Sequence, residues 1–140
     1  MIEPLRKPML GSGRLERYTR RLARRQEAAK AEKDAKHAEY LRLKKIRWDC
    51  YLRDSRKCRA FGIPLLFETD NLLKLAHSHH VKHKSAGGSD EAFNRATLSP
   101  KAHQLHHDGL LTITGNGNST LYLVQRDSKG ITLKAWESTV

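Results

Sequence analysis

The chain has 140 residues, a length that favours one domain with little room for a second core. Lysine and arginine number 27 against 15 aspartates and glutamates, which gives a formal net charge of +12 at neutral pH. This surplus argues against an acidic partner-binding tail and favours a polyanionic partner, nucleic acid before an anionic membrane surface. The apolar share of 38% predicts that part of the chain lies outside any packed core.

The same sequence argues against membrane insertion and secretion. No stretch approaches the ~18 consecutive apolar residues of a membrane-spanning helix. The first eight residues, from Met1 to Pro8, lack the apolar core of a cleaved secretory signal. Two cysteines, Cys50 and Cys58, cannot build a disulfide framework. We therefore expect a cytoplasmic protein without a membrane partner.

The positive charge lies in the first part of the chain. Residues 1–60 hold 19 Lys and Arg against 8 Asp and Glu, whereas the remaining 80 residues hold 8 against 7. From Arg14 to about Leu52 there is neither Gly nor Pro, and Ser12 is a candidate N-cap. This pattern predicts a basic helical arm over residues 1–40, continuing as one long helix or as two helices joined near residue 38.

The first half of that helix is polar all round, so it is either solvated or in contact with a charged partner. Arginine favours contact, because its guanidinium binds phosphate in a bidentate manner. The residues expected to bind nucleic acid through this arm are Arg20, Arg21, Arg24 and Arg25.

The rest of the sequence predicts short strands and one short helix. We expect a strand within residues 72–81, a loop over residues 85–90 and a second short strand at residues 97–98. Ser99 and Pro100 are a strong helix start, and the helix should end before Gly109. Three further strands, over residues 110–114, 120–125 and 131–136, predict a small antiparallel meander.

Seven of the eight histidines fall between positions 77 and 107. His103 and His107 are four residues apart on the predicted helix, so both imidazoles leave one face and can bind one metal ion. Such a pair alone is more often a surface coincidence than a metal site. His79 and His80 are adjacent on the predicted strand and point to opposite faces. One of them can therefore join the metal while the other stands beside it and takes a proton from water.

The two histidine pairs belong to a longer pattern of residues. It runs from His79-His80-Val81 through Lys84, Gly87-Gly88-Ser89-Asp90 and Asn94 to His103 and His107. This pattern resembles that of the HNH endonuclease family, and the similarity covers roughly residues 45–115. The resemblance implies a ββα-metal module within residues 41–109, whereas the basic arm and the C-terminal meander have no counterpart in it. Together these parts predict an α+β fold, with the β-meander over residues 110–140 packed on the module.

The resemblance also implies a role for each matching residue. His80 is the general base that activates the attacking water, and Asn94 holds the loop that orients it. His79, His103 and His107 bind one divalent metal ion, which can be Mg²⁺, Mn²⁺, Ni²⁺ or Zn²⁺. Independently of the resemblance, the basic residues Lys82 and Lys84 of the same segment are further candidates for binding nucleic acid.

Many relatives carry two Cys-x-x-Cys pairs that bind a structural zinc. Here Cys58 remains, while the other three positions are Phe61, Ser99 and Ala102. A lone cysteine cannot make a four-ligand zinc site, so we expect no structural zinc.

The leading hypothesis is therefore a metal-dependent endonuclease that cleaves double-stranded DNA in a bacterial or phage-infected cell. One alternative is a non-catalytic nucleic-acid-binding module with a structural metal. Another is a basic helical scaffold of a phage particle or ribonucleoprotein, with incidental histidines. Homo-oligomerisation through the N-terminal helix is a further open possibility.

Overall fold

The computed structural model of the protein describes residues 11–140. The N-terminal segment that suggested the absence of a secretory signal lies outside these residues. The chain divides into two compact units, one ending at Leu41 and the other running from Arg42 to Val140. No helix among the described residues has an apolar stretch long enough to cross a bilayer.

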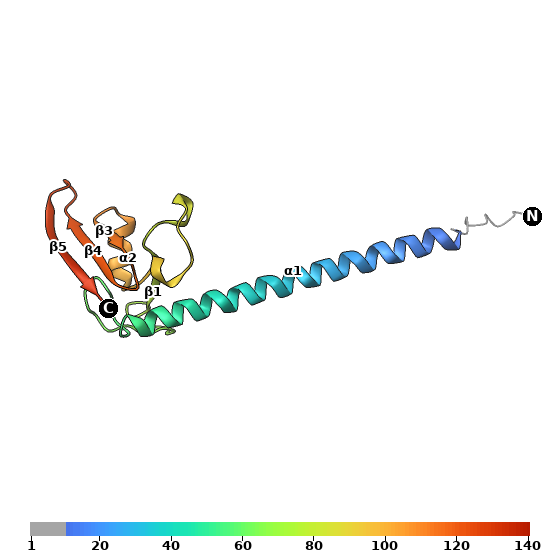
Figure 1. The fold of residues 1–140 in the computed structure, drawn as a ribbon, viewed down its shortest axis with the longest axis horizontal. Coiled ribbons are helices and arrows are strands. Elements are labelled where there is room, and N and C mark those ends of the chain that lie inside the picture. Colours follow the sequence, from blue (N-terminus) through green and yellow to red (C-terminus); the bar gives the residue numbers. More distant parts are fainter. Residues whose placement is uncertain (1–10) are drawn as a thin grey trace, which may run out of the picture. The chain divides into compact units, whose positions relative to one another are not determined.

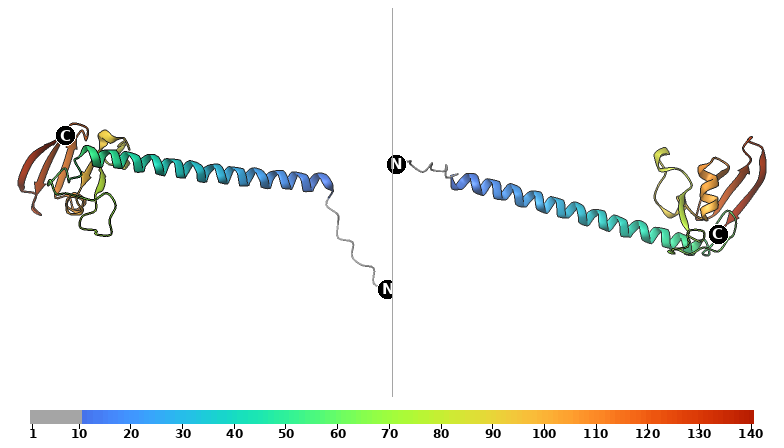
Figure 2. Two further views of the ribbon diagram at one scale, coloured as in Figure 1. Left: turned by 90° about the horizontal axis from the view of Figure 1, so that it is seen from below. Right: turned by 180° about the vertical axis from the view of Figure 1, so that it is seen from behind.

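Helix α1 (Ser12–Arg53) is a single uninterrupted helix, so the alternative of two helices is wrong (Figures 1 and 2). It begins at Ser12 itself, and the N–H of Arg14 donates to the carbonyl of Gly11; Ser12 is thus the first helical residue rather than the cap. From residue 12 to residue 42 every side chain is exposed. The helix ends where Ser55 and Arg56 adopt the left-handed conformation, with φ of 56° and 59°.

Two short antiparallel strands, β1 (His77–His80) and β2 (Arg95–Leu98), precede helix α2 (Pro100–His107). The connection contains two 3-10 helices, η1 (Lys84–Ala86) and η2 (Ala92–Asn94). The short strand expected within residues 72–81 occupies only residues 77–80 of that range. Leu72 and Leu73 are largely exposed, and the Asn71 side chain accepts the N–H of Leu73 in a turn.

The C-terminal meander is confirmed. Strands β3 (Leu111–Gly115), β4 (Thr120–Arg126) and β5 (Thr132–Thr139) form a three-stranded antiparallel sheet. Helix α2 contacts β3 as well as β1 and β2, and it lies between the two sheets in Figures 1 and 2. The core beneath it includes Leu98, Ala102, Leu111, Leu121 and Leu123. The fold is therefore of the mixed α+β class.

A buried ionic network joins the end of α1 to both sheets. Asp54 accepts hydrogen bonds from Arg53, from Arg59 and from the N–H of Thr97 in β2. Arg59 also donates to the carbonyls of Gly117 and Ser138. The network holds β2, the strand that pairs with β1.

Candidate metal centre and active site

Strand β1 places two adjacent histidines in different surroundings. Successive side chains of a strand point to opposite faces, so His79 and His80 diverge. His79 is buried with 5% of its surface exposed, whereas His80 is only partly buried. The register pairs His79 with Ala96 and His80 with Arg95 across β2.

The His79 ring faces the histidines of α2. Its centroid lies 4.2 Å from that of His106, 5.5 Å from that of His103 and 6.5 Å from that of His107. Burial, followed by the neighbouring imidazoles, lowers the pKa of His79 to about 3. The ring therefore stays neutral at physiological pH, which is the form that binds metals.

The Nε2 atom of His79 is buried and has no hydrogen-bond partner among the described residues. Buried polar atoms are almost always hydrogen-bonded, so an orphaned nitrogen calls for an explanation such as a bound ion. Its position beside other imidazoles fits a transition metal, which imidazole nitrogen suits well.

His103 and His107 face one another on α2. Their Nε2 atoms are 3.3 Å apart, and the ring planes are nearly perpendicular, at 85°. Two nitrogens bound to one tetrahedral zinc ion, each about 2.0–2.1 Å from it, are separated by about 3.3 Å. The contact is a hydrogen bond between the two imidazoles in this structure, and its length also equals the spacing of two ligands of one ion. Burial also lowers the pKa of His103.

The three predicted ligands are close together but do not form a closed cage. Within residues 11–140, no three His, Cys, Asp or Glu side chains are already arranged to hold a metal ion. The donor type, the orphaned Nε2 of His79 and the spacing of the helical pair fit a metal.

His80 is held by a carboxylate. Its Nε2 atom lies 2.8 Å from Oδ1 of Asp90, whose other oxygen lies 2.6 Å from Nζ of Lys84. Arg95 contacts the same Oδ1 at 3.0 Å. Hydrogen bonds from Lys84 and His80 lower the pKa of Asp90 to about 2, so this carboxylate is ionised at neutral pH.

Asn94 is buried and closes the loop between β1 and β2. Its Oδ1 accepts the N–H of Lys82, and its Nδ2 donates to the carbonyls of Lys82 and Ser89. Gly88 lies so close to Lys82 that a Cβ there would overlap the Lys82 carbonyl. The loop that carries Asp90 is therefore held against β1.

The positions that bind structural zinc in the resembled family have other roles here. The Ser99 hydroxyl caps α2 by accepting the N–H of Ala102, as expected, and Ala102 is fully buried. Phe61 stacks on Trp136, with ring centroids 6.1 Å apart. Cys58 is a buried free thiol. The absence of a structural zinc remains a prediction.

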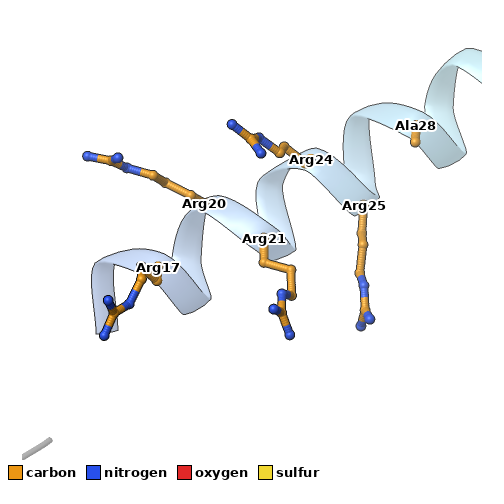
Figure 3. Close-up of a pocket in the computed structure, with 6 residues that line it drawn as sticks. All are labelled: Arg17, Arg20, Arg21, Arg24, Arg25 and Ala28. Carbon is orange, nitrogen blue, oxygen red and sulfur yellow. The ribbon is translucent and has the colours of Figure 1, made fainter. Parts of the chain in front are cut away.

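The predicted basic residues lie in both units. In the first, Arg17, Arg20, Arg21, Arg24 and Arg25 line one hollow together with Ala28. Figure 3 shows Arg20 and Arg24 extending from one side of the helix and Arg17, Arg21 and Arg25 from the other. In the second, Lys82 and Lys84 are exposed, and Lys84 is paired with Asp90.

Three further residues lie at the site without a role predicted from the sequence: Asp90, His77 and His106. His77 stacks on His103, with ring centroids 4.8 Å apart. The Nδ1 atom of His106 lies 2.9 Å from the carbonyl of Leu111. His106 could have been found from its place one turn after His103, whereas the contact of Asp90 with His80 depends on the loop.

Comparisons with models of protein families, with curated proteins and with solved structures find no match to this chain.

Proposed function

We propose that the protein is a metal-dependent endonuclease that hydrolyses phosphodiester bonds of double-stranded DNA. His79, His103 and His107 would hold one divalent metal ion, and His80 would act as the general base. The bound ion would supply charge stabilisation to the phosphate group and to the leaving oxygen. The proposal draws on the resemblance of the His-Asn-His pattern to HNH endonucleases and on the contacts of the site.

The observation that carries the proposal is the difference between two adjacent histidines. His79 is buried beside the imidazoles of α2 and has an orphaned Nε2, whereas His80 is partly exposed and contacts a carboxylate. A purely structural metal site would have no use for an unligated histidine next to it. Hydrolysis can use one, because a positioned base that takes a proton from water makes the water a better nucleophile.

The arginines of the first unit supply the affinity for DNA in this proposal. Six arginines and one glutamate lie between Arg14 and Arg25. All are exposed, and the hollow that five of the arginines line carries no carboxylate. Such a cluster suits phosphate oxygens, which fix a protein on DNA without reading its sequence.

The direct test is cleavage of supercoiled plasmid with Mg²⁺, Mn²⁺, Ni²⁺ or Zn²⁺, comparing the wild type with His80→Ala. General-base catalysis typically contributes ~10²–10⁴-fold, so His80→Ala should lose about that much of the rate. His83→Ala is the matched control, because His83 is an exposed histidine whose ring contacts Ser85 instead of the site. It should cleave like the wild type.

Equal cleavage by His80→Ala and the wild type would contradict the role of His80. A wild type that binds metal and DNA but never cleaves would favour the alternative of a non-catalytic nucleic-acid-binding module. The contacts among the site residues would then stabilise the fold without taking part in catalysis.

A further inference from the structure

Asp90 lies in the loop between β1 and β2, yet it is the hydrogen-bond partner of the His80 ring among the described residues. Its side chain is only 14% exposed, and the side chain of His80 is 24% exposed. The contact is therefore sheltered from most of the solvent. In such surroundings a hydrogen bond to an ionised group is stronger than one in water.

The carboxylate is fixed from several sides. Arg95, which faces His80 across the strand pair, donates from Nη2 to Oδ1 of Asp90 and from Nε to the Asp90 carbonyl. Arg95 is held in turn by Ser78, which accepts a hydrogen bond from its Nη1. Asn94 holds the preceding residue through the carbonyl of Ser89. Asp90 therefore has little freedom to leave His80.

We propose that Asp90 is a positioning residue that fixes the tautomer of His80, so that Nδ1 is the nitrogen that accepts the proton from water. An ionised carboxylate can only accept hydrogen bonds, so Nε2 of His80 must carry the proton in this contact. In the neutral ring, Nδ1 then carries the lone pair that can accept a proton from water. This inference rests on the proposed function for its catalytic meaning.

Protons and electron pairs balance over the hydrolysis. Nδ1 takes one proton from water, and the oxygen of the resulting hydroxide attacks phosphorus. The bond from phosphorus to the leaving oxygen breaks, and its electron pair goes to that oxygen, which takes a proton from solvent. The His80 imidazolium, stabilised by the Asp90 carboxylate beside it, later releases its proton to solvent.

The test combines a spectroscopic readout with kinetics. In ¹⁵N-labelled protein at about pH 8, where most imidazoles are neutral, ring ¹⁵N shifts report the tautomer of each histidine. The signals of His80 are those missing from a His80→Gln spectrum. We expect the Nε2–H tautomer in the wild type. Asp90→Asn should lose this preference, because an amide can donate to Nε2 as well as accept from it.

The rate of cleavage should change together with the tautomer of His80. Asp90→Asn should lower kcat by about 10- to 100-fold, a part of the general-base contribution, and change KM by less than about twofold. Glu91→Gln is the matched control: the same change of carboxylate to amide, one residue along, at an exposed side chain paired with Arg42. It should leave the tautomer and kcat unchanged.

An Nδ1–H tautomer in the wild type would overturn the inference without need of any variant, and so would an unchanged kcat in Asp90→Asn. The spectrum does not depend on DNA cleavage. A wild type that shows the Nε2–H tautomer but never cleaves would therefore contradict the proposed function and the catalytic use of Nδ1, and would reduce Asp90 to a structural partner of His80.

Discussion

The side-chain amide of Asn94 pairs with the backbone of Lys82 in both directions, accepting its N–H at 2.7 Å and donating to its carbonyl at 3.0 Å. A third hydrogen bond, to the carbonyl of Ser89, is 2.8 Å long. Asn94 thus holds the two ends of the loop that leads from His80 to Asp90. Asn94 therefore links the segment after the candidate base to the segment that carries its carboxylate partner.

Replacing Asn94 by Asp should destabilise the protein by about 1–3 kcal/mol, because the carboxylate cannot donate to either carbonyl. Urea unfolding measures the change, and plasmid cleavage should fall with it. Asn71→Asp is the control, because the Asn71 side chain accepts the N–H of Leu73 in an exposed turn, a hydrogen bond that a carboxylate can also accept. A similar loss of stability in both variants would show that the hydrogen bonds of the Asn94 amide contribute no more to stability than the one at Asn71.

The buried network around Asp54 should dominate the electrostatic contribution to stability. Asp54→Asn leaves Arg59, which is 7% exposed, without its ionised partner. Breaking a buried pair in this way costs about 3–5 kcal/mol. Asp49→Asn removes an exposed pair with Lys45 and should cost at most about 1 kcal/mol. Denaturant midpoints that differ little between the two variants would contradict this account.

Asp90 should make the stability of the protein depend on pH in the acid range. Its pKa falls from an ordinary value of 3.8 to about 2 in the folded protein, so its stabilising contribution is fully present above about pH 4. The contribution is lost as the pH falls through about 2. The difference in unfolding free energy between the wild type and Asp90→Asn should therefore be constant near neutral pH and narrow in acid. A difference that does not narrow would contradict the lowered pKa.

The arginine cluster can be separated from general positive charge on the same helix. A variant with Arg20→Gln, Arg21→Gln and Arg24→Gln should bind duplex DNA more weakly and with a shallower salt dependence, by about 0.9 in slope for each phosphate that is no longer neutralised. A variant with Lys30→Gln, Lys33→Gln and Lys36→Gln removes the same charge elsewhere on α1 and should change the slope less. Equal effects would indicate a diffuse charge effect without specific phosphate binding.

Much of this arrangement follows from sequence periodicity. The spacing of His103 and His107 predicts a shared helix face, and the adjacency of His79 and His80 predicts opposite strand faces. Ser99 and Pro100 predict the start of α2. These features depend on local geometry, which a single sequence encodes directly.

Other contacts depend on how the loops fold. The pairing of Asp90 with His80 follows from the clamp by Asn94 and the close approach of Gly88 to Lys82. The apolar residues Leu72 and Leu73 favoured a strand but lie in an exposed turn. Arg59 reaches residues about 60 to 80 positions further along the chain. No local pattern predicts such contacts.

The proposed mechanism depends most on the binding of one metal ion by His79, His103 and His107 and not by His80. Three imidazoles form a softer and less anionic donor set than the carboxylate sites that suit Mg²⁺. Calorimetric titration of the metal-stripped protein at neutral pH should give one Zn²⁺ site per chain, tighter than any for Mg²⁺. The site should be lost in His103→Ala and His107→Ala and kept in His80→Ala and His83→Ala. Zn²⁺ binding no tighter than that of Mg²⁺, or its loss in His80→Ala, would contradict the mechanism.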